Sequence, residues 1–199
     1  MQVYQLKIGP MDNFCYVLAC EASKEAILID PGWEKGKVQD FLTEKELTPV
    51  LIISTHSHYD HVQENDAWKQ EGIKILAHEL AVDAKPDIKV KDKETYDFCN
   101  ETITFLHAPG HDLGGMLIKA GKNLFTGDVL FIGAIGRTDL PGSDPAKMQE
   151  TLSIIKNLAE NLIVWPGHDY GPVAHRLLGI EKRENPFLRS ALHSGRDGN

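Results

Sequence analysis

Hydrophobic residues in the first third of the chain gather in short runs that are typical of β-strands. Residues 3–8, 14–20 and 26–30 are alternating or continuous apolar runs, and a turn containing glycine and proline separates the first two. Residues 50–55 form another short apolar run, which suits a buried strand. The chain is therefore expected to open with β-structure.

Helical spacing of apolar residues appears between and after these strands. In residues 37–47 the apolar side chains fall on one face of a helix. A second helix is expected from Asp60 to Gln70, followed by a strand at residues 73–78. Residues 83–97 are highly charged and contain a proline, so we expect a surface excursion there rather than a linker.

The second half of the chain repeats this pattern. Strands are expected at residues 101–108, 115–120, 122–127 and 161–167, and a helix is expected at residues 145–159. Two strand-rich halves that each carry helices predict an α/β (α+β) fold, with two sheets packed together and helices on the outside.

The length of the chain bears on its domain organisation. Its 199 residues are enough to bury a core without further staples. We therefore expect a single domain over residues 1–199. Its last part, residues 190–199, is expected to be a frayed tail.

Composition and charge narrow the possible partners. With 42% hydrophobic and 25% charged residues, the chain has the composition of a soluble globular protein. Its net charge of -8 argues against nucleic acid and against anionic membranes as partners. No apolar run approaches the ~20 residues that cross a bilayer, and no secretory signal is visible. We therefore expect a cytoplasmic protein, and the sequence leaves its oligomeric state open.

The cysteines agree with that expectation. Cys15, Cys20 and Cys99 form no CxxC pair, and their odd number leaves at least one of them unpaired within the chain. This pattern fits a reducing compartment. We interpret all three as small, buried, apolar side chains.

Metal-ligating residue types follow four of the expected strands. In open α/β sheets, sites gather at the ends of strands because the sheet fixes the loops that follow. If these strand ends lie along one edge, seven side chains converge. They are His56, His58, Asp60, His61, His111, Asp128 and His168.

The spacing of the first four of these residues is informative. Extended chain sends residues two apart to the same side, so His56 and His58 can bind one ion together. Asp60 and His61 stand where a helix is expected to begin, so they could face a second position. Imidazole and carboxylate are the usual ligands of zinc and of non-haem iron.

The segments THSHYDH, PGH, TGD and PGH occur in this order and resemble the metallo-β-lactamase fold, a four-layer αββα sandwich. The match extends over nearly the whole chain. The resemblance implies two divalent metal ions, with zinc favoured and iron or manganese as alternatives. It implies that His56, His58 and His111 bind the first metal and that Asp60, His61 and His168 bind the second. It also makes Asp128 a bridge between the metals and Asp30 a supporting residue.

The resemblance also implies a hydrolytic mechanism. Two cations would lower the pKa of a shared water from about 15.7 to roughly 7, which gives a hydroxide nucleophile at neutral pH. One cation would polarise the scissile carbonyl and stabilise the developing oxyanion. Asp60 would both bind metal and orient the attacking water.

Two further segments, residues 131–144 and 167–189, are similar to the glyoxalase II branch of this fold and its short bacterial and archaeal relatives. Carrying that pattern over, Arg137 and Tyr170 would contact glutathione. The chain stops before the C-terminal helical domain that adds further glutathione contacts in glyoxalase II. The function expected is therefore hydrolysis of a glutathione-type or related thioester, a small-molecule substrate.

Two alternatives remain open. The GRTD and GHDY segments also resemble persulfide dioxygenases, in which His56, His111 and Asp128 would hold a single iron. A segment typical of those enzymes is replaced here by GRTDLPG, which disfavours that hypothesis. A non-catalytic metal-binding module is the lesser alternative, because such a module has little need of a complete water-activating set.

Overall fold

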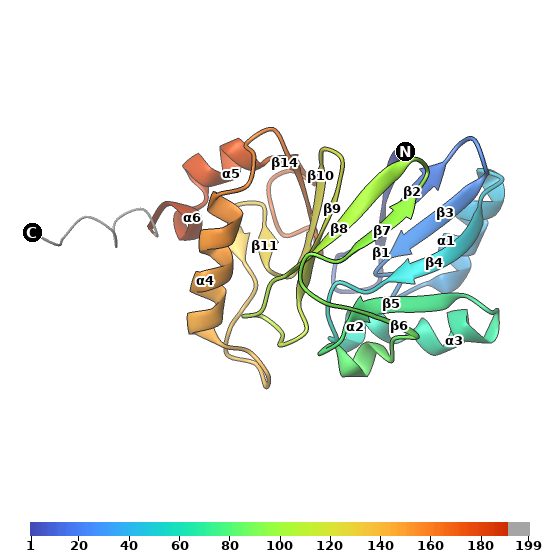
Figure 1. The fold of residues 1–199 in the computed structure, drawn as a ribbon, viewed down its shortest axis with the longest axis horizontal. Helices are drawn as coiled ribbons and strands as arrows, with labels where there is room; N and C mark the ends of the chain where they lie inside the picture. Colours follow the sequence, from blue (N-terminus) through green and yellow to red (C-terminus); the bar gives the residue numbers. More distant parts are fainter. Residues whose placement is uncertain (191–199) are drawn as a thin grey trace, which may run out of the picture.

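Two six-stranded sheets face each other in the computed structural model, which describes residues 1–190. Their strands run in the orders β1-β2-β3-β4-β5-β6 and β14-β13-β10-β9-β8-β7. Figure 1 shows α1 and α3 outside the first sheet and α4, α5 and α6 outside the second. These four layers confirm the fold class expected from the sequence.

The first sheet combines an antiparallel and a parallel half. Its strands are β1 (Gln2–Ile8), β2 (Asn13–Cys20), β3 (Glu25–Ile29), β4 (Thr48–Ile53), β5 (Lys74–His78) and β6 (Ile88–Val90). The first three strands pair antiparallel, whereas β3 to β6 pair parallel. The parallel strands are linked by α1 (Lys35–Glu44), α2 (Tyr59–Val62), α3 (Asn65–Gln70) and the 3₁₀ helix η1 (Val82–Ala84).

The second sheet is antiparallel except where β10 pairs parallel with β13. Its strands are β7 (Thr95–Phe98), β8 (Glu101–His107), β9 (Met116–Ala120), β10 (Asn123–Gly127), β13 (Ile163–Pro166) and β14 (Arg176–Leu177). A separate hairpin is formed by β11 (Leu130–Phe131) and β12 (Ala134–Ile135). The outer helices are α4 (Pro145–Lys156), α5 (Leu178–Glu184) and α6 (Pro186–Ser190).

A shared apolar core joins the two sheets. Tyr16 and Ile27 from the first sheet belong to the same buried cluster as Phe105 and Phe125 from the second. The rings of Tyr16 and Phe125 meet edge to face, with centroids 5.0 Å apart. Burial of this layer removes apolar surface from water and fixes the sheets against each other.

Three expectations from the sequence need revision. The helix expected from Asp60 to Gln70 is broken into α2 and α3, because His61 reaches inward to Asp30 while Trp68 is fully buried against the first sheet. Residues 83–97 remain at the surface but also provide β6 and most of β7, which are edge strands of the two sheets. The helices α5 and α6 were not expected.

The expected frayed tail lies outside the described residues except for Ser190, which ends α6. Within residues 1–190, no helix has both the length and the apolar character needed to cross a membrane.

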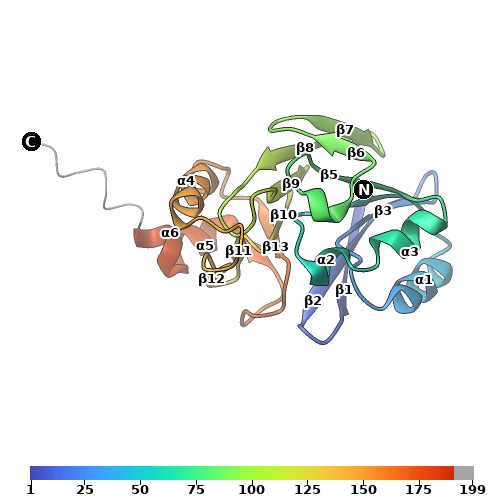
Figure 2. The same ribbon diagram turned by 90° about the horizontal axis from the view of Figure 1, so that it is seen from below.

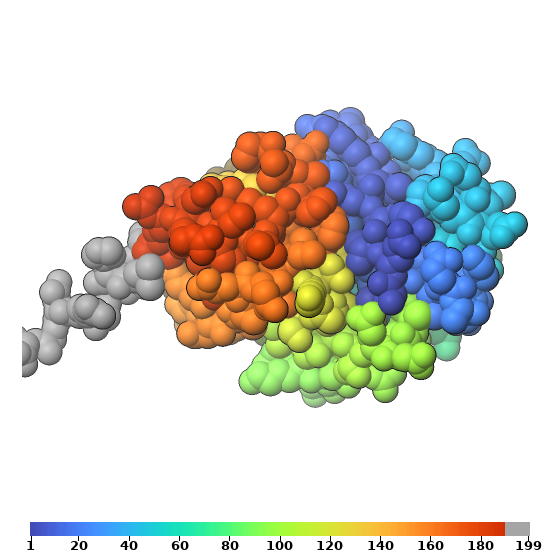
Figure 3. All heavy atoms as spheres, turned by 90° about the horizontal axis from the view of Figure 1, so that it is seen from above, coloured from blue at the N-terminus to red at the C-terminus, as the bar shows by residue number. Residues whose placement is uncertain are grey.

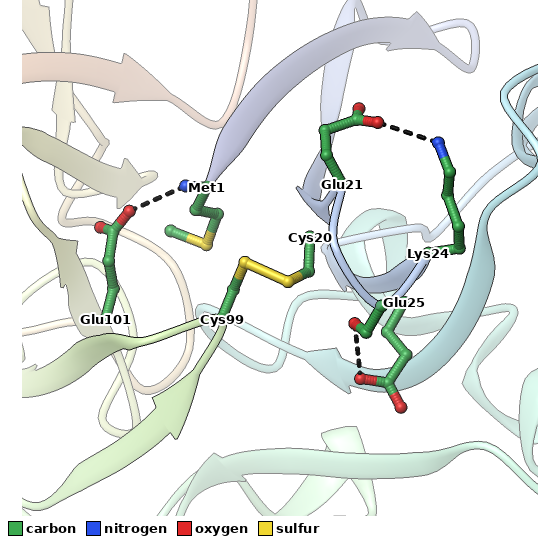
Figure 4. Close-up of a disulfide and its surroundings, with 8 residues drawn as sticks. Met1, Cys20, Glu21, Lys24, Glu25, Cys99 and Glu101 are labelled. Carbon is green, nitrogen blue, oxygen red and sulfur yellow. Dashed lines mark hydrogen bonds and ion pairs between the residues drawn. A yellow bond between two sulfur atoms is a disulfide. The ribbon is translucent and has the colours of Figure 1, made fainter.

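The interpretation of the cysteines was wrong for two of the three. Cys20 and Cys99 form a disulfide between the end of β2 and the turn of the β7–β8 hairpin, so it joins the two sheets (Figure 4). Only Cys15 is a buried free thiol, as expected. Because disulfides are rare in reducing compartments, the cysteines no longer support the expected cytoplasmic location, which stays a prediction.

The N-terminus lies next to this disulfide. The Met1 ammonium group is 3.0 Å from Glu101 Oε1, one residue into β8 (Figure 4). Figure 3 views this face of the molecule and shows the N-terminal residues in blue against the green β7–β8 hairpin. The two sheets are therefore held together here by a covalent bond and an ion pair.

Candidate metal centre

The seven predicted ligand residues lie in segments that follow four strands, with Asp60 and His61 in the short helix α2. His56, His58, Asp60 and His61 follow β4, and the others follow β8, β10 and β13. Figure 2 shows α2 and the β11–β12 hairpin at this end of the two sheets. The strand ends therefore do converge, as the sequence pattern predicted.

A first group consists of His56, His58 and His111, each of which offers one ring nitrogen within 4.8 Å of the other two. The Nε2 atoms of His56 and His111 are buried and have no hydrogen-bond partner. An unpaired buried nitrogen costs free energy unless something binds to it. This group therefore has the chemistry of a cation site.

A second group consists of Asp60, His61 and His168, whose ligand atoms also lie within 4.8 Å of one another. Asp60 Oδ2 is 3.3 Å from His61 Nε2 and 3.4 Å from His168 Nε2. The two Nε2 atoms are themselves 3.2 Å apart. In this group, therefore, the polar atoms contact each other.

Asp128 lies between the two groups. Its Oδ2 is 3.5 Å from His111 Nε2 and 3.2 Å from His168 Nε2, and its Oδ1 is 3.4 Å from His61 Nε2. Oδ1 is buried and accepts no hydrogen bond. A single carboxylate is thus within reach of both groups.

Backbone carbonyl groups orient two of the histidines. His111 Nδ1 lies 2.8 Å from the carbonyl oxygen of Arg137, and His168 Nδ1 lies 2.8 Å from that of Met11. Because a carbonyl oxygen can only accept, both Nδ1 atoms carry a proton and donate it. The Nε2 atoms that face the centre are then free to bind a cation when the rings are neutral.

Side chains orient two more histidines in the same way. Thr55 Oγ1 donates its proton to Asp30 Oδ2 at 2.6 Å, so it accepts from His56 Nδ1 at 3.0 Å. His61 Nδ1 donates to the same Asp30 oxygen at 3.1 Å. Asp30 therefore orients one histidine of each group, His61 directly and His56 through Thr55.

Electrostatics differ between the two groups in the metal-free protein. Burial, and then the neighbouring histidines, lower the pKa of His56 and His58. Burial also acts to lower the pKa of His61 and His168, but the adjacent carboxylates outweigh it and hold the His168 pKa at about 9. His56 and His58 are therefore neutral near pH 7, whereas His61 and His168 carry proton charge.

The carboxylates show the reciprocal effect. Burial acts to raise the pKa of Asp60 and Asp128, but contacts with the histidines outweigh it and lower both pKa values below the usual range. Both side chains are therefore anionic at neutral pH. Anionic oxygens beside ring nitrogens form a donor set suited to zinc or iron, and no sulfur takes part among the described residues.

The residues predicted to contact substrate border the centre in different ways. Tyr170 is half exposed and its ring stacks on His168, with centroids 4.6 Å apart. The Arg137 side chain points to Asp139, which accepts from Nε at 2.7 Å and from Nη2 at 2.9 Å. Arg137 therefore positions His111 through its backbone, a role that its side-chain chemistry did not suggest.

A cleft of about 740 Å³ opens beside the centre. It is lined by ligand residues from both groups, by Arg137 and Tyr170, and by a set of apolar side chains. This volume is within the usual range for small-molecule sites. The centre is therefore accessible to a substrate.

Asn13 is a buried polar residue that the sequence reasoning missed. Its Nδ2 donates to Asp60 Oδ2 at 2.9 Å, and the residue forms an isolated β-bridge with His168. Its partner Asp60 stands 47 positions away in the chain. No local signal marks such a contact, because Asn13 also fits the turn before β2.

Comparisons with known proteins identify a matching family model and similar sequences. The model of the Metallo-beta-lactamase superfamily matches residues 8–98 and 85–168. "Probable polyketide biosynthesis zinc-dependent hydrolase BaeB" of Bacillus velezensis is 32% identical over 179 residues, which cover 85% of this chain and 80% of that protein. "Hydroxyacylglutathione hydrolase GloC" of Haemophilus influenzae is 31% identical over 198 residues, which cover 87% and 92%.

Two solved structures share the fold. ETHE1 from Myxococcus xanthus superposes with a TM-score of 0.85 at 24% identity, covering 97% of this chain and 91% of that one. This identity is low enough that the likeness bears on the fold alone. TTHA1623 in a di-iron-bound form superposes with a TM-score of 0.80 at 29% identity, covering 93% and 100%.

Proposed function

This chain belongs to the metallo-beta-lactamase superfamily, and on that premise we propose that it is a metal-dependent thioesterase acting on glutathione-type or related thioesters. The observation that carries the proposal is the set of Nε2 atoms and carboxylate oxygens that converge from four loops into two adjacent groups. Its relatives include proteins named as a zinc-dependent hydrolase and as a hydroxyacylglutathione hydrolase.

We further propose that the centre holds two divalent cations, with zinc favoured over iron and manganese. The first group would bind one cation and the second group the other, while Asp128 would contact both. The di-iron form of TTHA1623 supports a dinuclear site, and the name of BaeB supports zinc. The donor set itself accepts all three metals.

The bound cations would supply a water of lowered pKa and would polarise the thioester carbonyl. In the net reaction the oxygen of water bonds to the acyl carbon, the carbon–sulfur bond breaks, and a carboxylate, a thiol and one proton are formed. Asp60 is proposed to orient the water, because its Oδ2 faces both His61 and His168. Asn13 fixes the orientation of this carboxylate by donating a hydrogen bond to it from Nδ2.

Substrate contacts are proposed for Tyr170 and Arg137, which border the cleft. Tyr170 offers an exposed ring edge and hydroxyl beside His168. A small molecule is the partner that this cleft fits, and the net charge of -8 disfavours nucleic acid and anionic membranes.

The test combines metal analysis with activity. Wild-type protein should contain close to two metal ions per chain and hydrolyse S-lactoylglutathione. His56→Ala and Asp128→Ala should each lose metal and at least about 100-fold in kcat/KM, because each removes a direct donor. His175→Ala, at an exposed position away from the centre, is the matched control and should keep both properties. Folded ligand variants with full activity would refute the proposal.

A second candidate function is oxidation of a persulfide by oxygen at a single iron. It is favoured by one observation: His56 Nε2, His111 Nε2 and Asp128 Oδ1 are buried and unpaired, whereas His61 and His168 of the second group both hydrogen-bond to Asp60. Two histidines and one carboxylate form the facial triad of non-haem iron oxygenases. One iron per chain, with oxygen uptake on glutathione persulfide and no thioester hydrolysis, would establish this alternative.

A further inference from the structure

The wall of the cleft is mainly apolar. It includes Phe131 from β11, Ile135 from β12 and Leu140 from the segment before α4. Met11 and Tyr59 also line the cleft, and the Tyr59 hydroxyl points to the Met11 sulfur at 3.0 Å. Apolar side chains that line a cleft beside a reactive centre mark a binding surface for an apolar group.

This wall begins directly at the ligand residues. The Phe131 ring lies edge to face with both His168 and Tyr170, at centroid distances of 5.9 and 5.3 Å. Tyr59 is adjacent in sequence to the ligands His58 and Asp60, and its side chain is 60% exposed. An acyl group whose carbonyl lies at the metal centre would therefore contact apolar side chains directly.

Cationic groups are scarce in the same cleft. Apart from the histidines, Arg137 is the only basic residue among the described residues that line it. Its Nε and Nη2 already donate to Asp139. Glutathione carries two carboxylates, and the residues that line the cleft do not offer two free cationic side chains to pair with them.

On the basis of the proposed thioesterase function, we infer that the cleft selects thioesters by an apolar acyl chain longer than the lactoyl group. The common biological thiol carriers are polar, amide-containing molecules, so the acyl part is the one that suits these walls. The carrier would then lie toward the open mouth, and the acyl chain would pack along Phe131, Ile135 and Leu140. The substrate class is thus a medium-chain acyl thioester.

The decisive experiment varies only the acyl chain. The full-length, metal-loaded protein is assayed with acetyl, butyryl, hexanoyl and octanoyl thioesters of N-acetylcysteamine, a small uncharged thiol. We expect kcat/KM to rise about two- to fourfold for each added methylene up to octanoyl. It should also exceed the value for S-lactoylglutathione. Equal values along the series would overturn the inference, as would a preference for lactoylglutathione that Arg137→Ala abolishes.

A matched pair of variants separates the cleft from general hydrophobicity. Leu140→Gln places an amide in the wall and should remove most of the dependence on chain length, measured as the ratio of kcat/KM for the octanoyl thioester to that for the acetyl thioester. Ile154→Gln makes the same kind of change on the exposed surface of α4, outside the cleft. It should leave the whole series unchanged, and an equal effect of both variants would contradict the inference.

Failure of the thioesterase proposal can be recognised separately by binding. Octanoate and acetate, the products of two of these substrates, are titrated into the metal-loaded protein by calorimetry. One outcome is that no thioester is hydrolysed, that octanoate still binds more tightly than acetate, and that Leu140→Gln removes this difference. The apolar subsite would then be supported, and the proposed thioesterase reaction would be refuted. If octanoate binds no more tightly than acetate, the subsite itself is refuted.

Discussion

At the scale of single residues, the side-chain types alone predicted which residues would gather, but not how each would be oriented. His111 and His168 are oriented by the carbonyl groups of Arg137 and Met11, and any residue could provide such a carbonyl. Asn13 was missed for the opposite reason, because its contact with Asp60 depends on the fold and on nothing adjacent in sequence.

His168 gives a prediction about pH. In the metal-free protein its pKa is about 9, above the usual 6.5, because the carboxylates of Asp128 and Asp60 outweigh the effect of burial. The protonated form therefore stabilises the metal-free fold fully below pH 6.5, and this stabilisation is lost as the pH rises through 9. A cation needs the neutral ring, so binding near pH 7.5 must release a proton.

The measurement is calorimetric titration of metal-free protein with zinc in two buffers that differ in ionisation enthalpy. We expect release of at least one proton per chain at pH 7.5, and an apparent affinity at the second group that weakens by about tenfold per pH unit for each proton released as the pH falls from 9 to 6.5. Zinc binding without proton release, or affinity independent of pH in that range, would contradict the assigned protonation.

At the scale of elements, the strands β1 to β5, β8 to β10 and β13 and the long helix α4 were predictable because their apolar periods are undisturbed by the site, whereas the short strands β6, β7, β11, β12 and β14 were not predicted. Asp144 also caps α4 by accepting from the backbone N–H groups of Ala146 and Lys147. The segment after His58 was not predictable in detail, because the inward contact of His61 with Asp30 breaks the helical pattern. Tertiary contacts overrode local propensity there.

Loop glycines give a second prediction. A Cβ added to Gly167 would lie 2.2 Å from Asp128 Oδ1, which is too close for any contact. Gly167→Ala should therefore displace this buried carboxylate and weaken metal binding by about 10- to 100-fold, the size typical when a ligand loses its orientation. Metal affinity can be measured by competition with a chromophoric chelator.

The matched control is Gly36→Ala in α1, where an added Cβ meets nothing within 4 Å. This variant should bind metal as the wild type does, and it should unfold at slightly higher denaturant concentration because alanine favours the helix. Equal metal affinity in the two variants would show that the close approach of Gly167 to Asp128 has no consequence for the centre.

At the scale of the whole molecule, the arrangement of two packed sheets with helices outside them followed from the order of strands and helices along the chain, although α5 and α6 were not expected. The disulfide between them did not, because three cysteines allow several pairings and composition does not place any two of them together. Cys20 and Cys99 are separated by 79 positions and meet only because the β7–β8 hairpin lies beside the end of β2. Long-range packing decides such a pairing.

This bond gives a prediction about stability. Closing a loop of this length reduces the entropy of the unfolded chain by an amount worth about 4 kcal/mol. Replacing both residues, Cys20→Ala and Cys99→Ala, should lower the free energy of unfolding of the metal-free protein by roughly that amount. Denaturant titration measures it, and the wild type under reducing conditions should unfold like the double variant. A double variant as stable as the oxidised wild type would contradict the prediction.

The same bond also changes what a protease could do to this molecule. Cys20 and Cys99 close a covalent ring that contains β3 to β6 and the whole loop bearing His56, His58, Asp60 and His61. A single nick anywhere in that ring would release no fragment, and the nicked chain would still migrate as one species until it was reduced. Four of the seven candidate ligands would thus stay tethered to the other three after the backbone between them had been cut.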